Sequence, residues 1–378
     1  MSLKITVISF ENPFPPDYGG AIDVYYKIKN LKKLGTKIRL IFFTRKRRNF
    51  EPLRPFCDEV YLFPQSQNPF LLLKNLPLAV LSRYNNELLR LLKSADDNDI
   101  LFFEGLQTTA ILNYFTPSLA VLLRLHNWES EYYKMSGKQT SNILKKLYFS
   151  SESKKFDFYE KFIFSKFNHV FAISQTESKL LSNLSISNDW LPPFHPFDEI
   201  ILNHPEQIEP FILYHGNLTI PENIRSVEFI VKKIAPLVKH KIFIAGKYPH
   251  KSIVSWIKQQ KNIELIQPKN HLETIEWIKK AKINLLLTFQ PTGIKLKLLY
   301  ALFSGNLVVA NKEMLTGTGL NNMVTETNND PHLIAEKLNK LMEARIDRDT
   351  LYHHKSEALK IYDNLSNAQK IVDTAKKF

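Results

Sequence analysis

The sequence predicts an α/β protein of two Rossmann-like domains, each with a parallel sheet, that face each other across a cleft. At 378 residues the chain exceeds the size at which one hydrophobic core usually stops growing. Short β-branched or aromatic runs alternate with longer segments of helical spacing, which is typical of parallel sheets covered by helices. This alternation stops at one proline-dense segment and then restarts, which indicates two domains.

The first domain is expected at residues 1–195. Its strands should be the continuous apolar runs, as in buried parallel sheets. The segments 22–34 and 129–166 carry apolar residues at helical spacing, with lysine and glutamate elsewhere. The runs are KITVISF, KIRLIFFT, EVYLFP, ILFFEG, AVLLRLHN and HVFAIS.

The hinge is expected in WLPPFHP at residues 190–196, because proline disfavours a helical conformation in the residue before it. The second domain then covers residues 196–349. Its predicted strands are FILYHG, HKIFIAG, NIELIQP, INLLLTF and LVVAN. The last stretch, 350–378, has a helical pattern with no strand after it, and we expect it to pack back on the first domain.

The composition indicates a cytoplasmic globular protein. Hydrophobic residues make up 44% and charged residues 23%, which is enough apolar surface for folded cores. A single cysteine, Cys57, excludes an internal disulfide framework, and no secretory signal is evident at the start of the chain. The apolar segment 70–84 contains Lys74, Pro77 and Arg83, and it is too short to cross a bilayer.

The charge balance predicts an anionic partner. The net charge is +14, and basic residues cluster at 45–48 and 145–155. A solvated basic face would explain both clusters, and so would phosphorylated substrates. No nucleic-acid motif accompanies the charge, so nucleic acid is not expected as a partner. We expect peripheral contact with an anionic membrane, at the inner face of the plasma membrane, through 70–90 and 145–155.

In parallel sheets ligands bind at the carboxyl ends of the strands, so residues directly after each strand are candidates. Gly19 and Gly20 follow the first strand and precede a helix, where backbone N–H groups can bind an anion. A turn that needs positive φ is the alternative. The pair does not form a GxGxxG fingerprint, which argues against a dinucleotide cofactor.

A second group of candidates ends the strand AVLLRLHN. His126 is placed where it can hydrogen-bond a sugar hydroxyl or a carbonyl, with Arg124 before it and Glu129 close behind. Glu104 follows the preceding strand, where it would orient an acceptor or cap a helix. A histidine packed between the domains is the structural alternative for His126.

The second domain offers Gly216 with Asn217, and Gly246 with Lys247, directly after its first two strands. These four residues are therefore candidates for ligand contacts at this edge of the sheet.

The segment PTGIKLKLLYALFSG carries the most informative pattern. Thr292 and Gly293 precede a helix whose first turn contains Lys295, a combination of backbone donors, helix dipole and point charge that suits a diphosphate. Lys297 lies two residues further on, so it points away from Lys295 and is expected at the surface or between the domains.

These segments resemble the GT-B glycosyltransferases related to family 4, along nearly the whole chain. The matching pieces are PFPPDYGGA, LRLHNWESEYY, FAISQTESKLL, HGNLTIPEN, IAGKYP and PTGIKLKLLYALFSG. The resemblance implies transfer of a sugar from a nucleotide diphosphate donor, bound mainly by the second domain, to an acceptor bound mainly by the first. It implies retention of anomeric configuration without a metal ion. Gly20 would approach the donor phosphate, His126 the transferred sugar and Lys295 the diphosphate.

The sequence departs from the family at the donor site. The usual glutamate pair falls on Thr292 and Tyr300, and the usual Arg and Lys fall on Asn217 and Glu222. A divergent subgroup with a similar GIKLKLL segment lacks the second glutamate as well. The lost charges also fit a protein that binds a nucleotide sugar or glycan without turnover. A nucleotide-sugar epimerase, which shares this architecture, is a third interpretation.

The predicted function is a hexosyltransferase acting in the synthesis of cell-surface polysaccharide or glycoconjugate. The partners are a nucleotide sugar and a glycan or lipid-linked acceptor. No cofactor other than the donor substrate, and no metal, is expected. To the donor side we assign Gly19, Gly216, Asn217, Gly246, Lys247, Thr292, Gly293 and Lys297. To the acceptor side we assign Asp17, Glu104, Arg124 and Glu129. Our hypothesis is that closure brings Gly19 and Gly20 to the β-phosphate while Lys295 stabilises the departing diphosphate, so that no side-chain nucleophile is needed.

Overall fold

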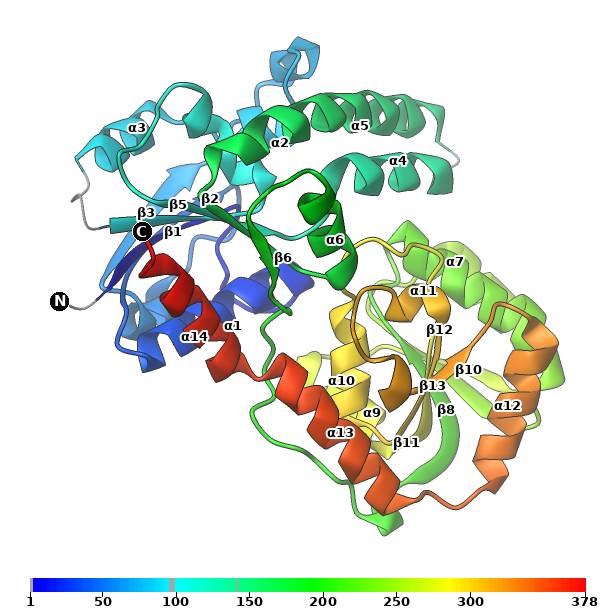
Figure 1. Cartoon of the computed structure of the whole chain (residues 1–378). Helices are drawn as coiled ribbons and strands as arrows, with labels where there is room; N and C mark the ends of the chain where they lie inside the picture. Colours follow the sequence, from blue (N-terminus) through cyan, green and yellow to red (C-terminus); the bar gives the residue numbers. More distant parts are fainter. Residues whose placement is uncertain (1–2, 95–98, 141) are drawn as a thin grey trace. The chain divides into compact units, whose positions relative to one another are not determined.

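The computed structural model describes residues 3–94, 99–140 and 142–378. The chain forms two compact units, each built on its own parallel sheet (Figure 1). The first unit comprises Met1–Pro196 together with Tyr362–Phe378, and the second comprises Phe197–Ile361. The prediction of an α/β protein with two parallel-sheet domains is confirmed.

The described part of the first unit contains a seven-stranded sheet of order β3-β2-β1-β4-β5-β6-β7, with every neighbouring pair parallel. All six predicted runs form strands. The seventh, β7, was not predicted, because three residues are too few to show a pattern. The strands are β1 Lys4–Ser9, β2 Lys37–Thr44, β3 Glu59–Pro64, β4 Asp99–Glu104, β5 Val121–Leu125, β6 His169–Ala172 and β7 Asn188–Trp190.

Helices cover both faces of this sheet. The segment 129–166 divides into two antiparallel helices, α4 and α5, and Asn142 caps α5 by accepting a hydrogen bond from Lys145 N. The helices are α1 Gly19–Lys33, α2 Leu78–Leu81, α3 Asn86–Lys93, α4 Glu129–Gln139, α5 Ile143–Ile163, α6 Gln175–Asn183 and α14 Asn364–Ala375. Short 3₁₀ helices are η1 Glu51–Phe56, η2 Pro69–Leu73, η3 Leu106–Asn113 and η4 Phe164–Lys166.

Successive residues of each central strand enter opposite cores, as the pleat requires. In β4, Ile100 and Phe102 pack beneath α1, whereas Leu101 and Phe103 face the side of α5. The final stretch is helical, as predicted, and it forms two helices. Only α14 packs against α1; the preceding helix, α13, is part of the second unit up to Ile361.

The second unit contains a parallel sheet of order β10-β9-β8-β11-β12-β13, six strands within the described residues. The strands are β8 Glu209–His215, β9 Lys241–Ala245, β10 Ile263–Ile266, β11 Ala281–Leu286, β12 Leu307–Asn311 and β13 Thr325–Thr327. The helices are α7 Pro221–Phe229, α8 Lys251–Ile257, α9 His271–Lys280, α10 Leu296–Ser304, α11 Lys312–Leu315, α12 Pro331–Glu343 and α13 Arg348–Tyr362. Short 3₁₀ helices are η5 Pro205–Gln207, η7 Ala235–Leu237 and η8 Asn321–Met323, and η6 Ile230–Ile234 is a π-helix.

The strand order of each sheet reverses at one point, and that point locates a binding crevice. In the first unit the reversal lies between β1 and β4, and in the second between β8 and β11. The candidate residues follow these strands. Within the described ranges, no helix combines the length and apolar character that crossing a membrane requires.

Candidate active site

A buried cluster of charged side chains lies beside the point where the strand order of the first sheet reverses. Lys27 Nζ lies 2.7 Å from Glu104 Oε1 and 3.2 Å from Asp23 Oδ2. Arg124 Nε donates to Asp23 Oδ2 at 3.1 Å, and His126 Nε2 lies 2.9 Å from Glu104 Oε2. Helix α1 supplies Asp23 and Lys27, one turn apart, and the ends of β4 and β5 supply the other three.

Two cations keep the two carboxylates of this cluster ionised. Burial alone would raise the pKa of Asp23, but Arg124, Lys27 and His126 outweigh it and hold that pKa below its ordinary range. Burial likewise opposes ionisation of Glu104, and Lys27 with His126 holds its pKa below normal. An ionised carboxylate can only accept hydrogen bonds, so His126 Nε2 donates its N–H to Glu104.

Asp23, Glu104 and His126 place ligand atoms within 4.8 Å of one another, a spacing that could suit a metal ion. The ammonium of Lys27 contacts both carboxylates, and Arg124 contacts Asp23. Two positive charges therefore already balance the two negative ones, so the residues present do not need a cation and fit one poorly.

The structure places Arg124 differently from the sequence expectation of an acceptor contact. Its side chain has no solvent exposure, and Nη1 donates to the carbonyl of Leu191. Asp23 also accepts a hydrogen bond from Phe194 N at 2.7 Å. The guanidinium is therefore fully used in joining β5, α1 and the segment after β7.

The ring of Phe10 connects Gly20 with His126. Phe10 packs edge-on against His126 at a centroid distance of 5.3 Å. A Cβ added to Gly20 would lie 2.5 Å from the tip of that same ring. Gly20 has no positive φ, so the turn that needs positive φ, offered as an alternative from sequence, is wrong for it. Its small size leaves room for the aromatic ring that positions His126.

Gly19 and Gly20 open helix α1, and Tyr18 precedes it without a side-chain capping bond. No acidic residue lies in the first turn. The amide groups at this helix end therefore suit an anion. Asp17 is exposed and pairs with Arg47 at 2.7 Å, so its carboxylate fixes the loop before the helix.

Glu129 begins α4 and is buried beside a second carboxylate, Glu160 of α5. Burial and then the charge of Glu160 raise the pKa of Glu129 to about 8, and burial raises that of Glu160 to about 7. Gln107 donates to Glu129 Oε1 at 2.7 Å. Glu129 is thus a protonated acid at neutral pH.

In the second unit, two glycines let the ends of β8 and β9 meet. A Cβ on Gly246 would lie 2.2 Å from the carbonyl oxygen of Gly216, closer than any real contact allows. Asn217 and Lys247 follow these glycines and are exposed. Asn217 Oδ1 accepts hydrogen bonds from the amide and hydroxyl of Thr219, which fixes this loop.

Lys297, expected at the surface or between the domains, is partly buried in the second unit. Its Nζ donates to Asn223 Oδ1 at 2.9 Å and to the Tyr214 hydroxyl at 3.1 Å. Burial lowers its pKa to about 8. Because Lys297 lies in the first turn of a nine-residue helix with apolar neighbours on both sides, its side chain is drawn into the unit toward these polar partners.

Lys295 is the N-cap residue of α10, one position before the first helical turn that the sequence predicted. Its ammonium donates to the carbonyl of Thr292 and lies 4.0 Å from Glu222 Oε1. Glu222 also accepts a hydrogen bond from the Thr288 hydroxyl. Gly293 has φ of +65°, which allows the tight turn that folds Lys295 back.

The two positions that lack the family's glutamates have other partners. The hydroxyl of Thr292 accepts a hydrogen bond from Gln290 at 3.1 Å. Tyr300 is 5% exposed and packs edge-on against Phe197 and His271, so an aromatic contact stands where the family has its second glutamate.

His215 ends β8 in the same unit. Its Nε2 is buried and has no hydrogen-bond partner among the described residues. Burial, then the charge of Lys297, lowers the pKa of His215 to about 3, so the ring is neutral.

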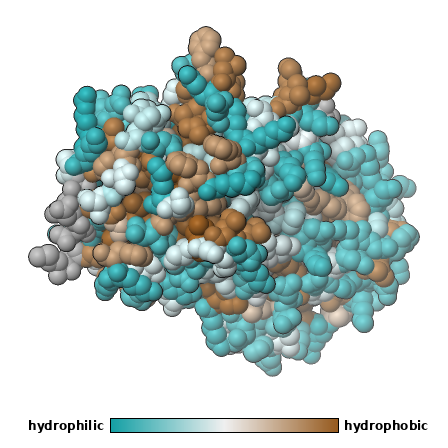
Figure 2. Space-filling view, turned by 45° about the horizontal axis from the view of Figure 1, so that its top comes forward, coloured by the Kyte–Doolittle hydropathy of each residue, from teal (hydrophilic) through white to brown (hydrophobic). Residues whose placement is uncertain are grey.

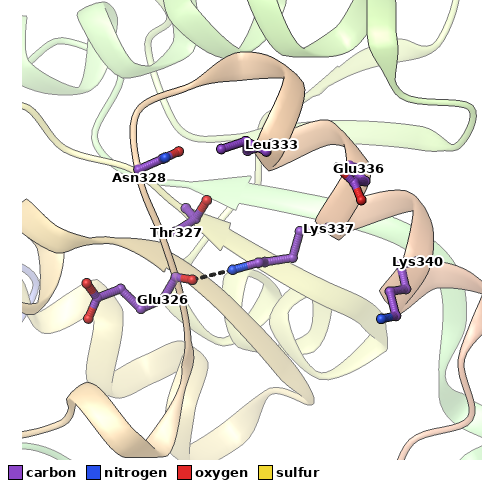
Figure 3. A pocket seen from close by; sticks show the side chains of 7 residues that line it. All are labelled: Glu326, Thr327, Asn328, Leu333, Glu336, Lys337 and Lys340. Atoms are coloured by element: carbon purple, nitrogen blue, oxygen red, sulfur yellow. Dashed lines mark hydrogen bonds between the residues drawn. The ribbon is translucent and has the colours of Figure 1, made fainter.

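Two open hollows of the second unit lie elsewhere. One, of about 470 Å³, lies between β13 and α12, where Lys337 reaches across to the carbonyl of Glu326 (Figure 3). The other, of about 790 Å³, lies near Asn203 and Arg348. Neither is lined by a residue that the sequence singled out for the active site.

Comparisons with known proteins bear on the family of one segment and on the fold of the whole chain. Residues 209–344 match the family described as glycosyl transferases group 1. The whole fold is similar to the crystal structure of TarM, with a TM-score of 0.71 and 12% identity over 99% of each chain. It is also similar to HepE of Anabaena in complex with UDP and glucose, with a TM-score of 0.67 and 13% identity over 100% of each chain. The chain has the GT-B fold.

A relative found by sequence comparison is a protein whose activity is not characterized. An uncharacterized 44.6 kDa protein in the cps region of Klebsiella pneumoniae is 28% identical over 337 residues, which cover 84% of this chain and 78% of the relative. A glycosyltransferase from Rickettsia africae gives a TM-score of 0.65 at 16% identity, covering 100% of this chain and 98% of that one. At these identities the solved structures establish the fold alone.

Sequence reasoning missed several residues of the two crevices. Asp23 and Lys27 were hidden inside a predicted helix, although two opposite charges one turn apart among apolar residues were a usable signal. Tyr214 and Asn223 gave no signal, because a strand tyrosine and a helix asparagine are ordinary residues at such places. Nothing in the sequence indicated a buried Glu160 either, since its burial depends on how α4 and α5 pack.

Proposed function

We propose that this chain is a glycosyltransferase that moves a sugar from a nucleotide diphosphate donor to a glycan or lipid-linked acceptor. The observation that carries the proposal is the pair of lysines at the start of α10, beside the switch point of the second sheet. Lys295 and Lys297 provide two ammonium groups next to a helix N-terminus, which suits a diphosphate. The match of 209–344 to the group 1 glycosyl transferases supports the same interpretation.

In this proposal the second unit binds the donor. Glu222 is the counter-ion of Lys295 before the donor arrives, since the two groups lie only 4.0 Å apart. The donor diphosphate would take over this charge, so Lys295 could stabilise it as it departs. Lys297 is set deeper, with Tyr214 and Asn223 to orient its ammonium.

The first unit would then bind the acceptor and the transferred sugar. His126 is oriented by Glu104 and by the ring of Phe10, and the N-terminus of α1 offers free amide groups to phosphate. Arg124 is left out of this role because it has no solvent exposure. We propose retention by front-face attack, in which the leaving phosphate oxygen accepts the proton from the acceptor hydroxyl. This step needs no side-chain nucleophile.

The finer parts of the proposal concern setting and chemistry. We propose a hexosyl donor, no metal ion at the diphosphate, and a cytoplasmic role in the synthesis of cell-surface polysaccharide. HepE was solved with UDP and glucose, and the Klebsiella relative is described as lying in the cps region. These descriptions motivate the choice of UDP-sugars as first donors to test.

The test is donor consumption by the purified protein, with and without an extract of lipid-linked acceptors. We expect release of nucleoside diphosphate that depends on the acceptor, and about 100-fold slower release by Lys295→Ala. Lys258→Ala, an exposed lysine on the same unit, is the matched control. Acceptor-dependent release at the wild-type rate by Lys295→Ala would remove that lysine from the mechanism.

The binding-only alternative is favoured by one observation, the occupation of the second glutamate position by a packed aromatic, Tyr300. Nucleotide-sugar binding with no donor consumption under any acceptor would support it. Interconversion of free nucleotide sugar without an acceptor would instead identify an epimerase.

A further inference from the structure

An apolar and basic surface covers one side of the first unit. We call it the α5 surface and define it by η2 and the outer side of α5. Phe70, Leu73, Ile143, Leu144, Leu147 and Phe158 are between 63% and 81% exposed, although all are large hydrophobic residues. Figure 2 shows two hydrophobic projections on this side, one over η2 and one over the N-terminal end of α5.

The outward position of these side chains is imposed by the fold. The inner side of α5 is already anchored by Phe156, Tyr159 and Ile163, which are fully buried. Leu144, Leu147, Phe158 and Phe162 follow one another at helical spacing on the opposite side. They have no core left to enter, and soluble proteins rarely expose such a patch without a partner.

Polar contacts hold η2 and the start of α2 against α5, so both projections belong to the same side of the first unit. Lys155 Nζ donates to the carbonyl of Leu72 in η2 at 2.8 Å, and Glu152 Oε2 accepts from Leu78 N of α2 at 2.7 Å. The side chain of Asn68 caps η2 by accepting from Phe70 N. The short helix therefore presents Phe70 and Leu73 from a fixed backbone.

The charge of this surface identifies its partner. Lys145, Lys146 and Lys154 lie exposed among the apolar residues of α5. The acidic residues of the same helix add little negative charge, because Glu152 and Glu160 are buried and Asp157 pairs with Lys161 at 2.7 Å. Apolar side chains interleaved with unbalanced lysines match the boundary between the acyl chains and anionic headgroups of a bilayer.

We propose that the α5 surface docks this protein on an anionic membrane, with Leu73, Leu144 and Leu147 inserted among the lipids and Lys145 and Lys146 contacting the headgroups. A second copy of the chain fits less well, because a symmetric interface would bring the two lysine rows together. The proposal does not depend on transfer activity, since the surface uses none of the residues assigned to donor or acceptor.

The test is flotation of the purified full chain with vesicles, in the absence of any donor. We expect binding to mixed phosphatidylglycerol and phosphatidylcholine vesicles, and much weaker binding to phosphatidylcholine alone. Leu73→Ser/Leu144→Ser/Leu147→Ser should lower the partition constant at least about tenfold, because three apolar side chains no longer enter the lipid. Lys145→Gln/Lys146→Gln should lower it about tenfold at low ionic strength and much less at high salt.

Matched controls use the second unit. Tyr248→Ser/Leu272→Ser/Leu333→Ser removes three exposed apolar side chains and Lys258→Gln/Lys261→Gln removes two exposed charges, and both should bind as the wild type does. Thermal unfolding of every variant should match the wild type. Absence of binding to anionic vesicles, or equal binding by the triple leucine variant, overturns the proposal. A wild-type dimer that the triple leucine variant dissociates, without vesicle binding, assigns the surface to a second copy instead.

Discussion

Lys297 is a proposed binding residue that we expect to destabilise the fold. Its ammonium has two uncharged hydrogen-bond partners, Tyr214 and Asn223, and the nearby carboxylate of Glu222 offsets its burial only in part. Burial lowers its pKa from 10.5 to about 8, so below pH 8 the folded protein carries a poorly solvated charge. A bound diphosphate would compensate that charge, and this gives the lysine its proposed role.

The Lys297→Met variant separates the two effects. We expect it to be more stable than the wild type at pH 7 by on the order of 1 to 3 kcal/mol, because the buried charge is gone. Wild-type stability should rise between pH 8 and 10.5, where the unfolded chain holds the proton and the folded chain has lost it, and the variant should lack this rise. Urea denaturation at several pH values measures both.

Nucleoside diphosphate affinity should move in the opposite direction, because Lys297→Met removes a cation from the donor site. Lys258→Met is the matched control on the surface of the same unit. A variant that loses stability at pH 7 while its affinity stays unchanged would show that Lys297 is only a structural residue.

Glu129 gives a pH dependence of the opposite sign. Its folded pKa of about 8 lies above the ordinary 4.5, so the folded state holds a proton that the unfolded state releases. The stability of the first unit should therefore fall as pH rises from 4.5 to 8, and Glu160, with a pKa of about 7, adds to the same window.

Glu129→Gln keeps the acceptor oxygen for Gln107 but cannot ionise. We expect a shallower fall of the unfolding free energy across this window and a gain on the order of 2 kcal/mol at pH 8. Glu131→Gln, on the exposed side of the same helix, should leave the pH profile as in the wild type. Parallel profiles for Glu129→Gln and the wild type would contradict burial of the acid.

At the scale of elements, the ion pair between Asp23 and Arg124 joins α1 to β5. Both side chains are at most 1% exposed, so loss of one partner leaves the other as a poorly compensated buried charge. Arg124→Met should destabilise the first unit by about 3 to 5 kcal/mol. Arg54→Met, which breaks a pair whose members are more than 60% exposed, should cost at most about 1 kcal/mol. Chemical denaturation compares the two variants, and a similar small loss for both would contradict the structural role of Arg124.

The strands were predictable because buried parallel strands are continuous apolar runs. β1, β4 and β8 are plain in the sequence for this reason. β7 and β13 were not, because each has only three residues and is defined by its neighbour in the sheet rather than by its own pattern. The break between α4 and α5 was also missed, since apolar spacing continues across it.

The candidate site was predictable only at positions fixed by the strand ends. His126 and Glu104 were found by that rule, and so were the glycines after β8 and β9. Burial decides the rest. Arg124 was assigned to a ligand that it cannot reach, and Lys297 was expected at the surface, because one sequence does not reveal which polar residue faces inward.

At the scale of the whole molecule, each of the two units has its own proposed role. The first contains the charged cluster around His126 and the α5 surface, and the second contains both lysines of the proposed diphosphate site. The chain has a net charge of +14, and both of its proposed partners are anionic: a diphosphate for the second unit and a lipid surface for the first.

The most direct test of this account is titration calorimetry of the wild type and Lys295→Ala with UDP and with GDP. We predict that the wild type binds at least one of these nucleotides and that Lys295→Ala binds it at least about tenfold more weakly, because a charge-assisted contact to the diphosphate is lost. Lys258→Ala should bind as the wild type does. Failure of the wild type to bind either nucleotide, or equal affinity of Lys295→Ala, would contradict the account.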